Sequence, residues 1–342
     1  MKRRLGSLML ACVAIAAAAV VVSGQGPRPA PPPWAYGFSD VGPEPMAPPC
    51  PRDAKPMDCA LPGEPHTATD VLYEVPESDL KFNEAQVYDN YAPADWNPGD
   101  HPTMPDIIAH GRESDKLRAC GVCHYPNGMG KPENASPAGL PAAYVLQQLE
   151  AFRNGTRRTG DPRKANYNEM IQIARHMTEA EMKEVAEYYA SLERRQWIRV
   201  VETDTVPKTN HTSNGLFYPL PGNETEPLGR RIIEVPEAPE LTLTLRAPRS
   251  GFVAYVPVGS VARGEEIVTT GGGKTVQCTL CHGENLQGVA AVPGIVDLPT
   301  SYLVRQLYDF QAGTRESAMM RPIVAKLDED DMIAIAAYLA SK

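Results

Sequence analysis

The 342-residue sequence lacks several features that would place it in a common functional class. Beyond its first residues it has no run of lysine or arginine, and its formal net charge is −9, which argues against a nucleic-acid-binding surface. It contains no nucleotide-binding glycine motif and no plausible Ser/His/Asp assembly. Aromatic residues make up only 7%, but 42% of the residues are hydrophobic, so the chain can bury a core and is not disordered throughout.

Long apolar runs are also scarce, and the one that is present lies at the N-terminus. Three basic residues at positions 2–4 precede an uncharged apolar stretch over residues 5–22, and Ser23 and Gly24 follow it. This order is typical of a secretory signal peptide. We therefore expect a signal over residues 1–24 and a periplasmic or otherwise exported protein. An uncleaved helix that anchors the protein to the membrane is the alternative.

Proline, in contrast, is abundant. The chain has 34 prolines, and many of them lie between residues 27 and 105. Such a composition favours polyproline or irregular structure, so we expect an irregular N-terminal segment over residues 25–100. This segment contains Cys50 and Cys59. In an oxidising compartment these two cysteines are expected to form a disulfide bond.

The remaining cysteines of the exported part form a pattern that indicates a cofactor. They lie in two copies of C-x-x-C-H, namely Cys120-Gly-Val-Cys123-His124 and Cys278-Thr-Leu-Cys281-His282. C-x-x-C-H is the attachment motif of c-type haem. Two residues between the cysteines let one helical turn present both sulfurs to the porphyrin edge, and the histidine then lies under the iron as its proximal ligand. We therefore expect two covalently bound haem c groups.

Two other interpretations of a C-x-x-C pair are weaker. A thioredoxin-like dithiol site is expected near a βαβ pattern, and this sequence has no such pattern. A Cys₄ zinc site would have to bring together two motifs that lie 158 residues apart. Zinc would also not require the histidine that ends each motif. The haem interpretation accounts for the cysteines and the histidine of both motifs.

The sequence around the two motifs is duplicated. A shift of 158 residues superposes the motifs and also residues 140–157 on residues 298–315, where nine of eighteen positions are identical. The offset then falls to 150, so the first copy has eight extra residues between positions 158 and 169, and the alignment resumes after them. Duplication of one haem-binding lobe explains this pattern.

Both copies show the same order of helical signals. Core-facing residues at i, i+4, i+5 and i+8 indicate an amphipathic helix after each motif, and Gly155 and Gly313 lie where its C-cap would be. Capping-box spacing precedes the last helix of each copy. The expected helices cover residues 106–120 (a weak signal), 144–154 and 178–192 in the first copy, and residues 261–269, 302–312 and 328–341 in the second.

This arrangement resembles class I (mitochondrial-type) cytochrome c, present twice, and is most similar to the tandem dihaem cytochromes of the c-four type. The resemblance rests on the C-x-x-C-H motifs, the Y-x-x-x-Q-L-x-x-F-x-x-G-x-R helices, the methionines that follow them and the closing A-x-Y-x-A-S helices. It implies a mainly α fold with two tandem cytochrome c lobes, residues 101–197 and residues 259–342. A connector over residues 198–258 would join them.

The resemblance also implies the second axial ligand of each iron. In the resembled family, a methionine in the loop before the last helix supplies its sulfur to the iron. The candidates are Met170 in the first lobe and Met320 in the second, with Met319 as a rival to Met320. Met177 is not duplicated, because leucine occupies the equivalent position. His176 lies just after Met170, and bis-His ligation in one lobe is the alternative.

Other residues are candidates for supporting roles. Arg157 and Arg315 follow the amphipathic helices and could pair with haem propionates, because guanidinium binds carboxylates well; the alternative is a solvated surface arginine. Pro293 lies where the resembled family has a proline whose carbonyl orients the proximal histidine. The first lobe has Ala135 at that position, and it has Tyr125 where glycine usually follows the motif.

The connector contains strand-like runs. They cover residues 197–201, 232–235, 241–245 and 252–256, so we expect a small β-containing connector and not a floppy linker. Its length, together with the N-terminal segment, leaves room for docking surfaces.

The expected function is electron transfer. Each lobe offers both axial ligands, so no coordination site is left open for a substrate, and no catalytic residue is assigned. We expect a dihaem cytochrome that carries single electrons between a redox donor and acceptor protein, such as a membrane respiratory complex, and that is not itself an enzyme. The alternatives are a cytochrome subunit of a dehydrogenase or oxidase complex, or a haem enzyme with one open coordination site.

Overall fold

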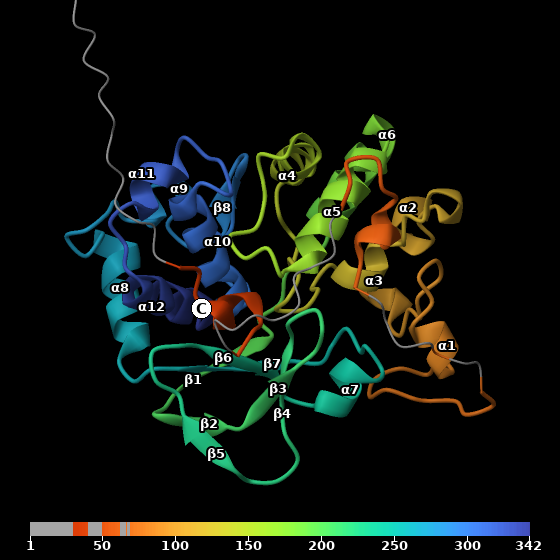
Figure 1. Cartoon of the computed structure of the whole chain (residues 1–342), viewed down its shortest axis with the longest axis horizontal. Coiled ribbons are helices and arrows are strands. Elements are labelled where there is room, and N and C mark those ends of the chain that lie inside the picture. Colours follow the sequence, from red (N-terminus) through yellow and green to blue (C-terminus); the bar gives the residue numbers. More distant parts are fainter. Residues whose placement is uncertain (1–29, 40–49, 62–65, 67–68) are drawn as a thin grey trace, which may run out of the picture. The chain divides into compact units, whose positions relative to one another are not determined.

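The protein is described here by a computed structural model that covers residues 30–39, 50–61, 66 and 69–342 (Figure 1). The expected signal or anchor over residues 1–24 lies outside the described residues. Helices are the main elements, which confirms the mainly α fold class. Among the described residues, no helix has both the length and the apolar character needed to cross a membrane. Residues Pro31–Lys342 form one compact unit.

The first haem motif lies in a set of helices with a core of its own. These helices are α2 (Asp106–Ala109), α3 (Cys120–His124), α4 (Ala142–Asn154), α5 (Ala165–His176) and α6 (Glu179–Ala190). α4 packs against both α5 and α6, and Leu149, Phe152 and Met182 are buried in this core. Gly155 caps α4 in the left-handed conformation, with φ of 75°. The capping box expected at the start of α6 is present.

The helix expected over residues 106–120 is much shorter in the structure. α2 ends at Ala109, and Gly111 follows with φ of 63°, a conformation that glycine adopts readily. A Cβ atom at Gly111 would lie 2.4 Å from the carbonyl oxygen of Leu117. The chain then makes a turn, with the short 3₁₀ helix η4 (Glu113–Asp115), before α3 begins. The close approach of this turn therefore explains why the helix stops.

The second motif lies in a matching set of helices. They are α8 (Ser260–Thr270), α9 (Thr279–His282), α10 (Thr300–Ala312), α11 (Met320–Val324) and α12 (Glu329–Ala340), with the two-stranded ribbon β8 (Gly288–Val289) and β9 (Val292–Pro293). α8 packs closely against α12. At their contact, a Cβ atom on Gly264 would lie 2.0 Å from the carbonyl oxygen of Ala334. Glycine lets the two backbones approach each other there.

The connector contains a small mixed sheet. Strands β1 (Ile198–Glu202), β7 (Phe252–Val256) and β6 (Ile233–Pro236) lie in the order β1-β7-β6, with β1 parallel and β6 antiparallel to β7. Two smaller ribbons accompany it, β2 (Thr205–Pro207) with β5 (Thr225–Pro227) and β3 (Thr209–His211) with β4 (Phe217–Pro219). Three of the expected strands, near residues 197–201, 232–235 and 252–256, are therefore present.

The fourth expected strand is wrong. Residues 241–245 belong mostly to helix α7 (Pro239–Leu243), which has proline in its first turn. Leu241 and Leu245 are four residues apart, and both join a hydrophobic cluster with Val75, Val87 and Trp96. Leu241 lies in the helix, and Leu245 lies just after its end. The alternation of leucine and threonine suggested a strand, but the packing partner in the N-terminal segment selects the helix.

The described parts of the Pro-rich segment are irregular, as expected, and they are packed. Their short elements are η1 (Pro33–Tyr36), η2 (Pro56–Cys59), α1 (Glu84–Val87) and η3 (Pro98–Asp100). Tyr36 donates a hydrogen bond of 2.6 Å to Asp309 of α10. Trp96 donates through Nε1 to the carbonyl oxygen of Leu245 at 2.8 Å. Cys50 and Cys59 form a disulfide bond, which confirms the expected pairing.

Candidate haem sites

The first C-x-x-C-H motif lies on the wall of a cavity. α3 carries Cys120, Cys123 and His124 to this wall, and neither cysteine is in a disulfide. The cavity offers about 190 Å³ to the centres of water molecules, far more than the roughly 10–15 Å³ that one water needs. Burial raises the pKa of Cys120 to about 12, so its thiol is neutral. The cavity therefore has room for a large group beside both sulfurs.

The ring of His124 is oriented for metal binding. Its Nδ1 lies 2.9 Å from the carbonyl oxygen of Ala135, which can only accept a hydrogen bond. Nδ1 must therefore carry the proton, and Nε2 keeps its lone pair for a metal ion. Burial lowers the pKa of His124, which favours the neutral imidazole that metals require. Because a backbone carbonyl makes this contact, the absence of proline at position 135 does not remove it.

Met170 lines the same cavity as His124. It does so from helix α5, so the expectation that a loop carries this methionine is wrong for the first lobe. Residues 165–176 contain neither glycine nor proline, and Asn166, Met170, Ile173 and Met177 line the cavity at helical spacing. The eight extra residues of the first copy lie between positions 158 and 169, around the start of this helix.

The composition of the cavity wall fits a haem group. Val145, Leu149 and Phe152 provide apolar surface. In the described part of the chain, seven buried polar atoms on lining residues have no hydrogen-bond partner, and among them are three donors: the hydroxyl of Tyr189 and the Nε atoms of Arg157 and Arg305. All three can donate to carboxylates, and buried donors are normally satisfied. A flat apolar ring with acidic substituents would match both features.

The second motif repeats the histidine geometry. His282, at the end of α9, places Nδ1 2.7 Å from the carbonyl oxygen of Pro293. Pro293 therefore makes the contact expected of it. Burial lowers the pKa of His282 and raises the pKa of Cys278 to about 11. Nε2 of this histidine, too, is left for a metal ion.

The two methionines of the second lobe differ in their surroundings. Met320 begins α11 and packs against the core of its lobe. Met319 is 67% exposed. A thioether that binds a haem iron must lie in the interior beside the ring, so the packing favours Met320 over its rival.

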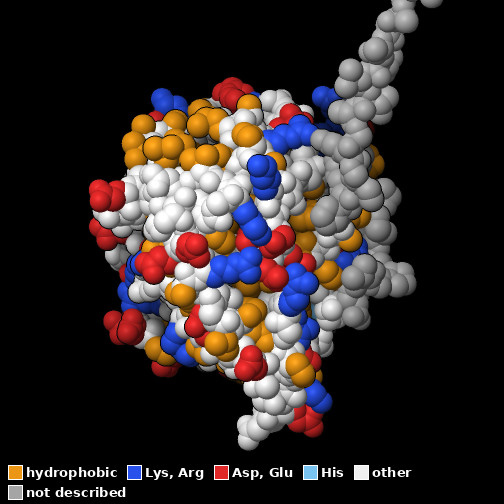
Figure 2. Space-filling model, turned by 90° about the vertical axis from the view of Figure 1, so that its left-hand side faces the viewer, with side chains coloured by type: hydrophobic (Ala, Val, Ile, Leu, Met, Phe, Trp, Pro, Cys, Tyr) orange, Lys and Arg blue, Asp and Glu red, His pale blue; other side chains and the backbone are white. Residues whose placement is uncertain are grey.

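The two motifs differ in their exposure to solvent. Val122 and Leu280 occupy equivalent positions between the cysteines, yet Val122 is 3% exposed and Leu280 is 67% exposed. The first motif is covered by Arg246 of the connector, which donates to the carbonyl oxygen of Val122, and by Asn90, whose carbonyl oxygen accepts from Ala119 N at 2.8 Å. Figure 2 shows hydrophobic side chains gathered at the upper edge of one face of the molecule. The described residues leave Leu280 of the second motif exposed.

Arg157 and Arg315 meet where the two lobes touch. The two residues form an isolated antiparallel bridge, and both are 5% exposed, which excludes solvated surface positions. Arg157 donates through Nη2 to Tyr302 and to Gln306 of the second lobe, each at 3.1 Å. These contacts put the Arg157 guanidinium inside the boundary between the lobes.

Arg315 makes the reciprocal contacts. It donates through Nη2 to Tyr144 at 2.6 Å and to Gln148 at 2.8 Å, both on α4 of the first lobe. Its guanidinium also stacks on Phe310, as that of Arg157 does on Phe152. No acidic side chain among the described residues forms an ion pair with either arginine. Two buried cations with only neutral partners leave room for anionic groups beside them.

The other candidates lie away from the cavity or in the core. Met182 and Met332 are buried in the two cores, as expected. His176 bonds through Nδ1 to the carbonyl oxygen of Gln172, within its own helix. His110 bonds to the carbonyl oxygen of Tyr91. Within the described ranges, no group of three or more His, Cys, Asp or Glu side chains is placed to hold a metal ion.

Some lining residues were missed in the sequence. Tyr189, Arg246 and Arg305 face the first cavity, but none is duplicated. Leucine occupies the position equivalent to Tyr189, and Arg305 aligns with Gln147. Arg305 and Arg246 also reach the first cavity from the second lobe and from the connector. The repeat, which was the signal for site residues, could not find them.

Comparison with known proteins places these sites in a family. Residues 108–193 match the family described as Cytochrome c. A thiosulfate dehydrogenase electron acceptor from Stutzerimonas stutzeri is 38% identical over 82 residues, which are 23% of this chain and only 38% of that protein. Cytochrome c4 from Azotobacter vinelandii is 24% identical over 233 residues, which cover 66% of this chain and 84% of the relative.

The solved structure of a cytochrome c4 from Acidithiobacillus ferrooxidans aligns with a TM-score of 0.43 at 20% identity, over 65% of this chain and 98% of the other. A further relative is matched almost in full. Cytochrome c-554(548) from Halomonas halodenitrificans is 31% identical over 88 residues, which cover 25% of this chain and 98% of that protein. The chain therefore belongs to the cytochrome c family, whose members transfer electrons through covalently bound haem c.

Proposed function

We propose that the chain is a dihaem cytochrome that carries single electrons between two redox proteins, with each haem held in one of two tandem lobes. Residues 101–197 would form the first lobe and residues 259–342 the second. The observation that carries the proposal is the repeated motif geometry. Each C-x-x-C-H histidine donates a hydrogen bond through Nδ1–H to a backbone carbonyl oxygen. The Nδ1···O distance is 2.9 Å for His124 and 2.7 Å for His282. Each motif therefore combines two thiols with an available Nε2 atom.

The proposed covalent sites are the four motif cysteines. Cys120 and Cys123 would hold the haem of the first lobe, and Cys278 and Cys281 that of the second. When bound, each haem supplies an iron that accepts or gives one electron without chemistry on a substrate.

The proposed axial ligands are one histidine and one methionine in each lobe. His124 and Met170 line one cavity, which supports this pair for the first lobe. His282 and Met320 are proposed for the second lobe because Met320 packs inward and Met319 does not. A thioether ligand raises the reduction potential. With both axial positions filled, neither site leaves room for a substrate, which supports a carrier and not an enzyme.

Arg157 and Arg315 are proposed to contact the haem propionates. Arg157 lines the first cavity and has a free Nε donor. Both guanidinium groups are buried among neutral oxygens, and a carboxylate beside each would neutralise its charge. Tyr and Gln side chains from the opposite lobe would hold each arginine in place.

The proposal is tested by counting haem. Purified protein from a host that attaches haem c should contain two haems per chain. The double variant Cys120→Ala/Cys123→Ala should retain one haem, and so should Cys278→Ala/Cys281→Ala. Wild-type protein with one haem or none would contradict the proposal.

A second role is suggested by relatives that are electron acceptors of thiosulfate dehydrogenase. The electron acceptor of thiosulfate dehydrogenase matches 38% of its own length, and this match suggests that a dehydrogenase supplies the electrons. The proposed location is the periplasm, where c4-type cytochromes function. Stopped-flow reduction of the holoprotein by candidate dehydrogenases with their substrates would test this role. Reduction that requires both the enzyme and its substrate would support it.

A further inference from the structure

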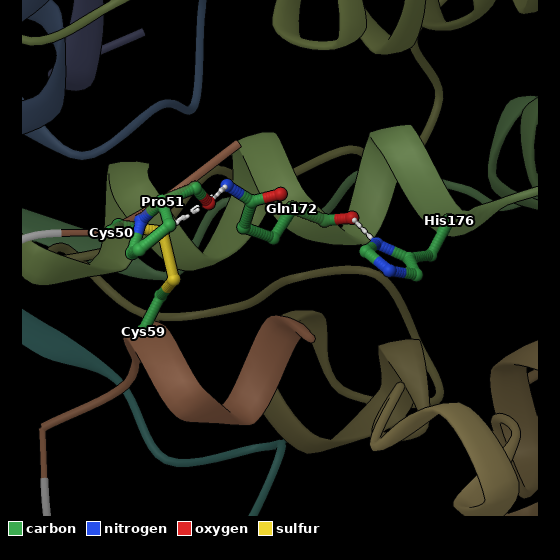
Figure 3. The surroundings of a disulfide bond; sticks show 5 residues. All are labelled: Cys50, Pro51, Cys59, Gln172 and His176. Carbon is green, nitrogen blue, oxygen red and sulfur yellow. Dashed lines mark hydrogen bonds between the residues drawn. A yellow bond between two sulfur atoms is a disulfide. The ribbon is translucent and has the colours of Figure 1, made fainter. Parts of the chain in front are cut away.

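The disulfide loop covers the outer face of helix α5. The bond between Cys50 and Cys59 closes a short loop that contains η2, and η2 packs against α5. Gln172, which is 1% exposed, donates through Nε2 to the carbonyl oxygen of Pro51 at 2.9 Å. The same Nε2 atom lies 3.2 Å from Sγ of Cys50. Figure 3 shows this side chain reaching from the helix to the loop.

The opposite face of α5 forms the wall of the first cavity. Met170 and Ile173 line it there, and Gln172 does not. Gln172 follows Met170 by two residues, which corresponds to a rotation of about 200° around a helix with 3.6 residues per turn. The helix therefore lies between the haem cavity and the disulfide loop.

The loop is itself fixed to the first lobe. Met57 donates from its backbone N to the carbonyl oxygen of Lys116 at 3.3 Å. Lys55 donates through Nζ to the carbonyl oxygen of Ser114 at 2.6 Å, and Cys59 is fully buried. These contacts attach the loop to the turn that precedes the haem motif. The loop thereby connects the histidine side of the site to the methionine side.

Among the described residues, the second lobe has no counterpart of this contact. Pro322 occupies the position equivalent to Gln172, and Lys326 the position equivalent to His176, and both are exposed. α11 is also much shorter, with five residues against twelve in α5. The disulfide loop therefore acts as a clamp on the helix of Met170, and the described residues provide no such clamp for Met320.

We propose that the Cys50–Cys59 loop is a positioning element that holds α5, and so the sulfur of Met170, against the haem iron of the first lobe. Gln172 is the positioning residue that joins the helix to the loop. The physical reason is that the bond between the Met170 sulfur and the iron can be broken and replaced, so the position of α5 decides whether it forms. Without support on its outer face, the helix is free to move away from the ring. This inference rests on the proposed function, because it takes Met170 as the axial ligand.

The test uses the holoprotein with both haems. In the variant Cys50→Ser/Cys59→Ser, the weak charge-transfer band of methionine-ligated ferric haem should fall to about half of its wild-type intensity. The reduced variant should bind carbon monoxide at one of its two haems. Gln172→Leu, which keeps the disulfide, should show the same change to a smaller extent. Pro322→Ala is the matched control and should keep the full band, because that position is exposed.

The outcomes separate the clamp from the ligand assignment. A full band and no carbon monoxide binding in the double-serine variant would overturn the proposal. If that variant loses the band of both haems, the fold is damaged and Gln172→Leu decides: partial loss from one haem supports the clamp, and a full band refutes it. Met170→Ala tests the ligand alone. If Met170→Ala keeps the full band, the proposed ligand set fails, whatever the loop does.

Discussion

Arg157 of the first lobe donates a hydrogen bond of 3.1 Å to the hydroxyl of Tyr302 in the second, and Arg315 returns the contact to Tyr144 at 2.6 Å. The backbone reinforces this exchange. Arg158 N donates to the carbonyl oxygen of Thr314 at 2.7 Å. Each copy supplies the arginine donor and the tyrosine acceptor of this contact, so the duplicated segments form the interface between the two lobes. The lobes are therefore expected to unfold together.

Loss of Arg157 from the interface between the two lobes should lower the free energy of unfolding of the whole protein. Arg157→Met leaves the Tyr302 hydroxyl without its donor in a buried site, which costs about 1–3 kcal/mol. Denaturant unfolding of the holoprotein, followed at the absorption of the haem groups, measures the loss. Arg158→Met is the control, because the Arg158 side chain is exposed and the residue joins the interface between the lobes through its backbone N. Equal stability of the two variants would refute a structural role for Arg157.

The ligand assignment can be tested within each lobe. Met320→Leu should remove about half of the charge-transfer band of methionine-ligated ferric haem, whereas Met319→Leu should leave it intact, because Met319 is 67% exposed. Met170→Leu should remove the other half, and Met177→Leu should not. The visible spectrum of the oxidised holoprotein provides the measurement. A band that disappears with Met177 would move the ligand of the first lobe to the end of α5.

The sequence predicted those elements whose signals are local. The expected helices over residues 144–154 and 302–312 match α4 and α10 to within two residues, and glycine caps both. Capping boxes at Thr178 and Asp328 begin α6 and α12 as expected. These features depend on spacing and on turn chemistry, which can be read without knowledge of the neighbours. The motif residues of both sites were found for the same reason.

Other features depend on contacts between distant segments, and these were missed. Residues 241–245 were expected to form a strand, and the contact of this segment with the N-terminal segment around Trp96 could not be read from the local pattern. Helix α5 packs against the loop around Cys59, which lies more than a hundred residues earlier in the chain. For Arg157, the sequence left two alternatives, a contact with a haem propionate and a solvated surface position. Its cross-lobe partners became visible only when both copies were seen together.

The two haems should differ in their access to small reagents. Leu280 is exposed where Val122 is covered by Arg246. Electron exchange at the second haem should therefore be faster. The single-haem variants Cys120→Ala/Cys123→Ala and Cys278→Ala/Cys281→Ala allow the comparison, by stopped-flow oxidation with hexacyanoferrate. Arg246→Ala should speed the reaction of the first haem alone. Equal rates in the two single-haem proteins would contradict the difference in cover.

Stability at low pH should depend on Asp100. Its carboxylate accepts from Arg249 at 2.6 Å and pairs with Arg195 at 2.8 Å. The hydrogen bond from Arg249 is the main cause that lowers the pKa of Asp100 from 3.8 to about 2. A carboxylate whose pKa is lower in the folded than in the unfolded protein stabilises the fold at pH values above its unfolded-state pKa. This stabilisation is lost as the pH falls towards the folded-state pKa.

The expected contribution of Asp100 is about 1 kcal/mol, because water screens part of this network. The free energy of unfolding of the wild type should therefore drop between pH 4 and pH 2 more steeply than that of Asp100→Asn. Urea titrations at several pH values measure both slopes. Parallel curves for the two proteins would show that the network does not contribute.

The contact between α8 and α12 should tolerate no side chain at Gly264. In an exposed helix, replacing glycine by alanine stabilises the protein by up to about 1 kcal/mol. At Gly264 the new Cβ would lie 2.0 Å from the carbonyl oxygen of Ala334, so the helices must separate. Overpacking of this kind costs about 1–3 kcal/mol, and the sign of the effect should therefore reverse. Gly99→Ala, which meets nothing within 4 Å, is the control. A Gly264→Ala protein as stable as the wild type in denaturant unfolding would mean that the two helices do not approach as closely as described.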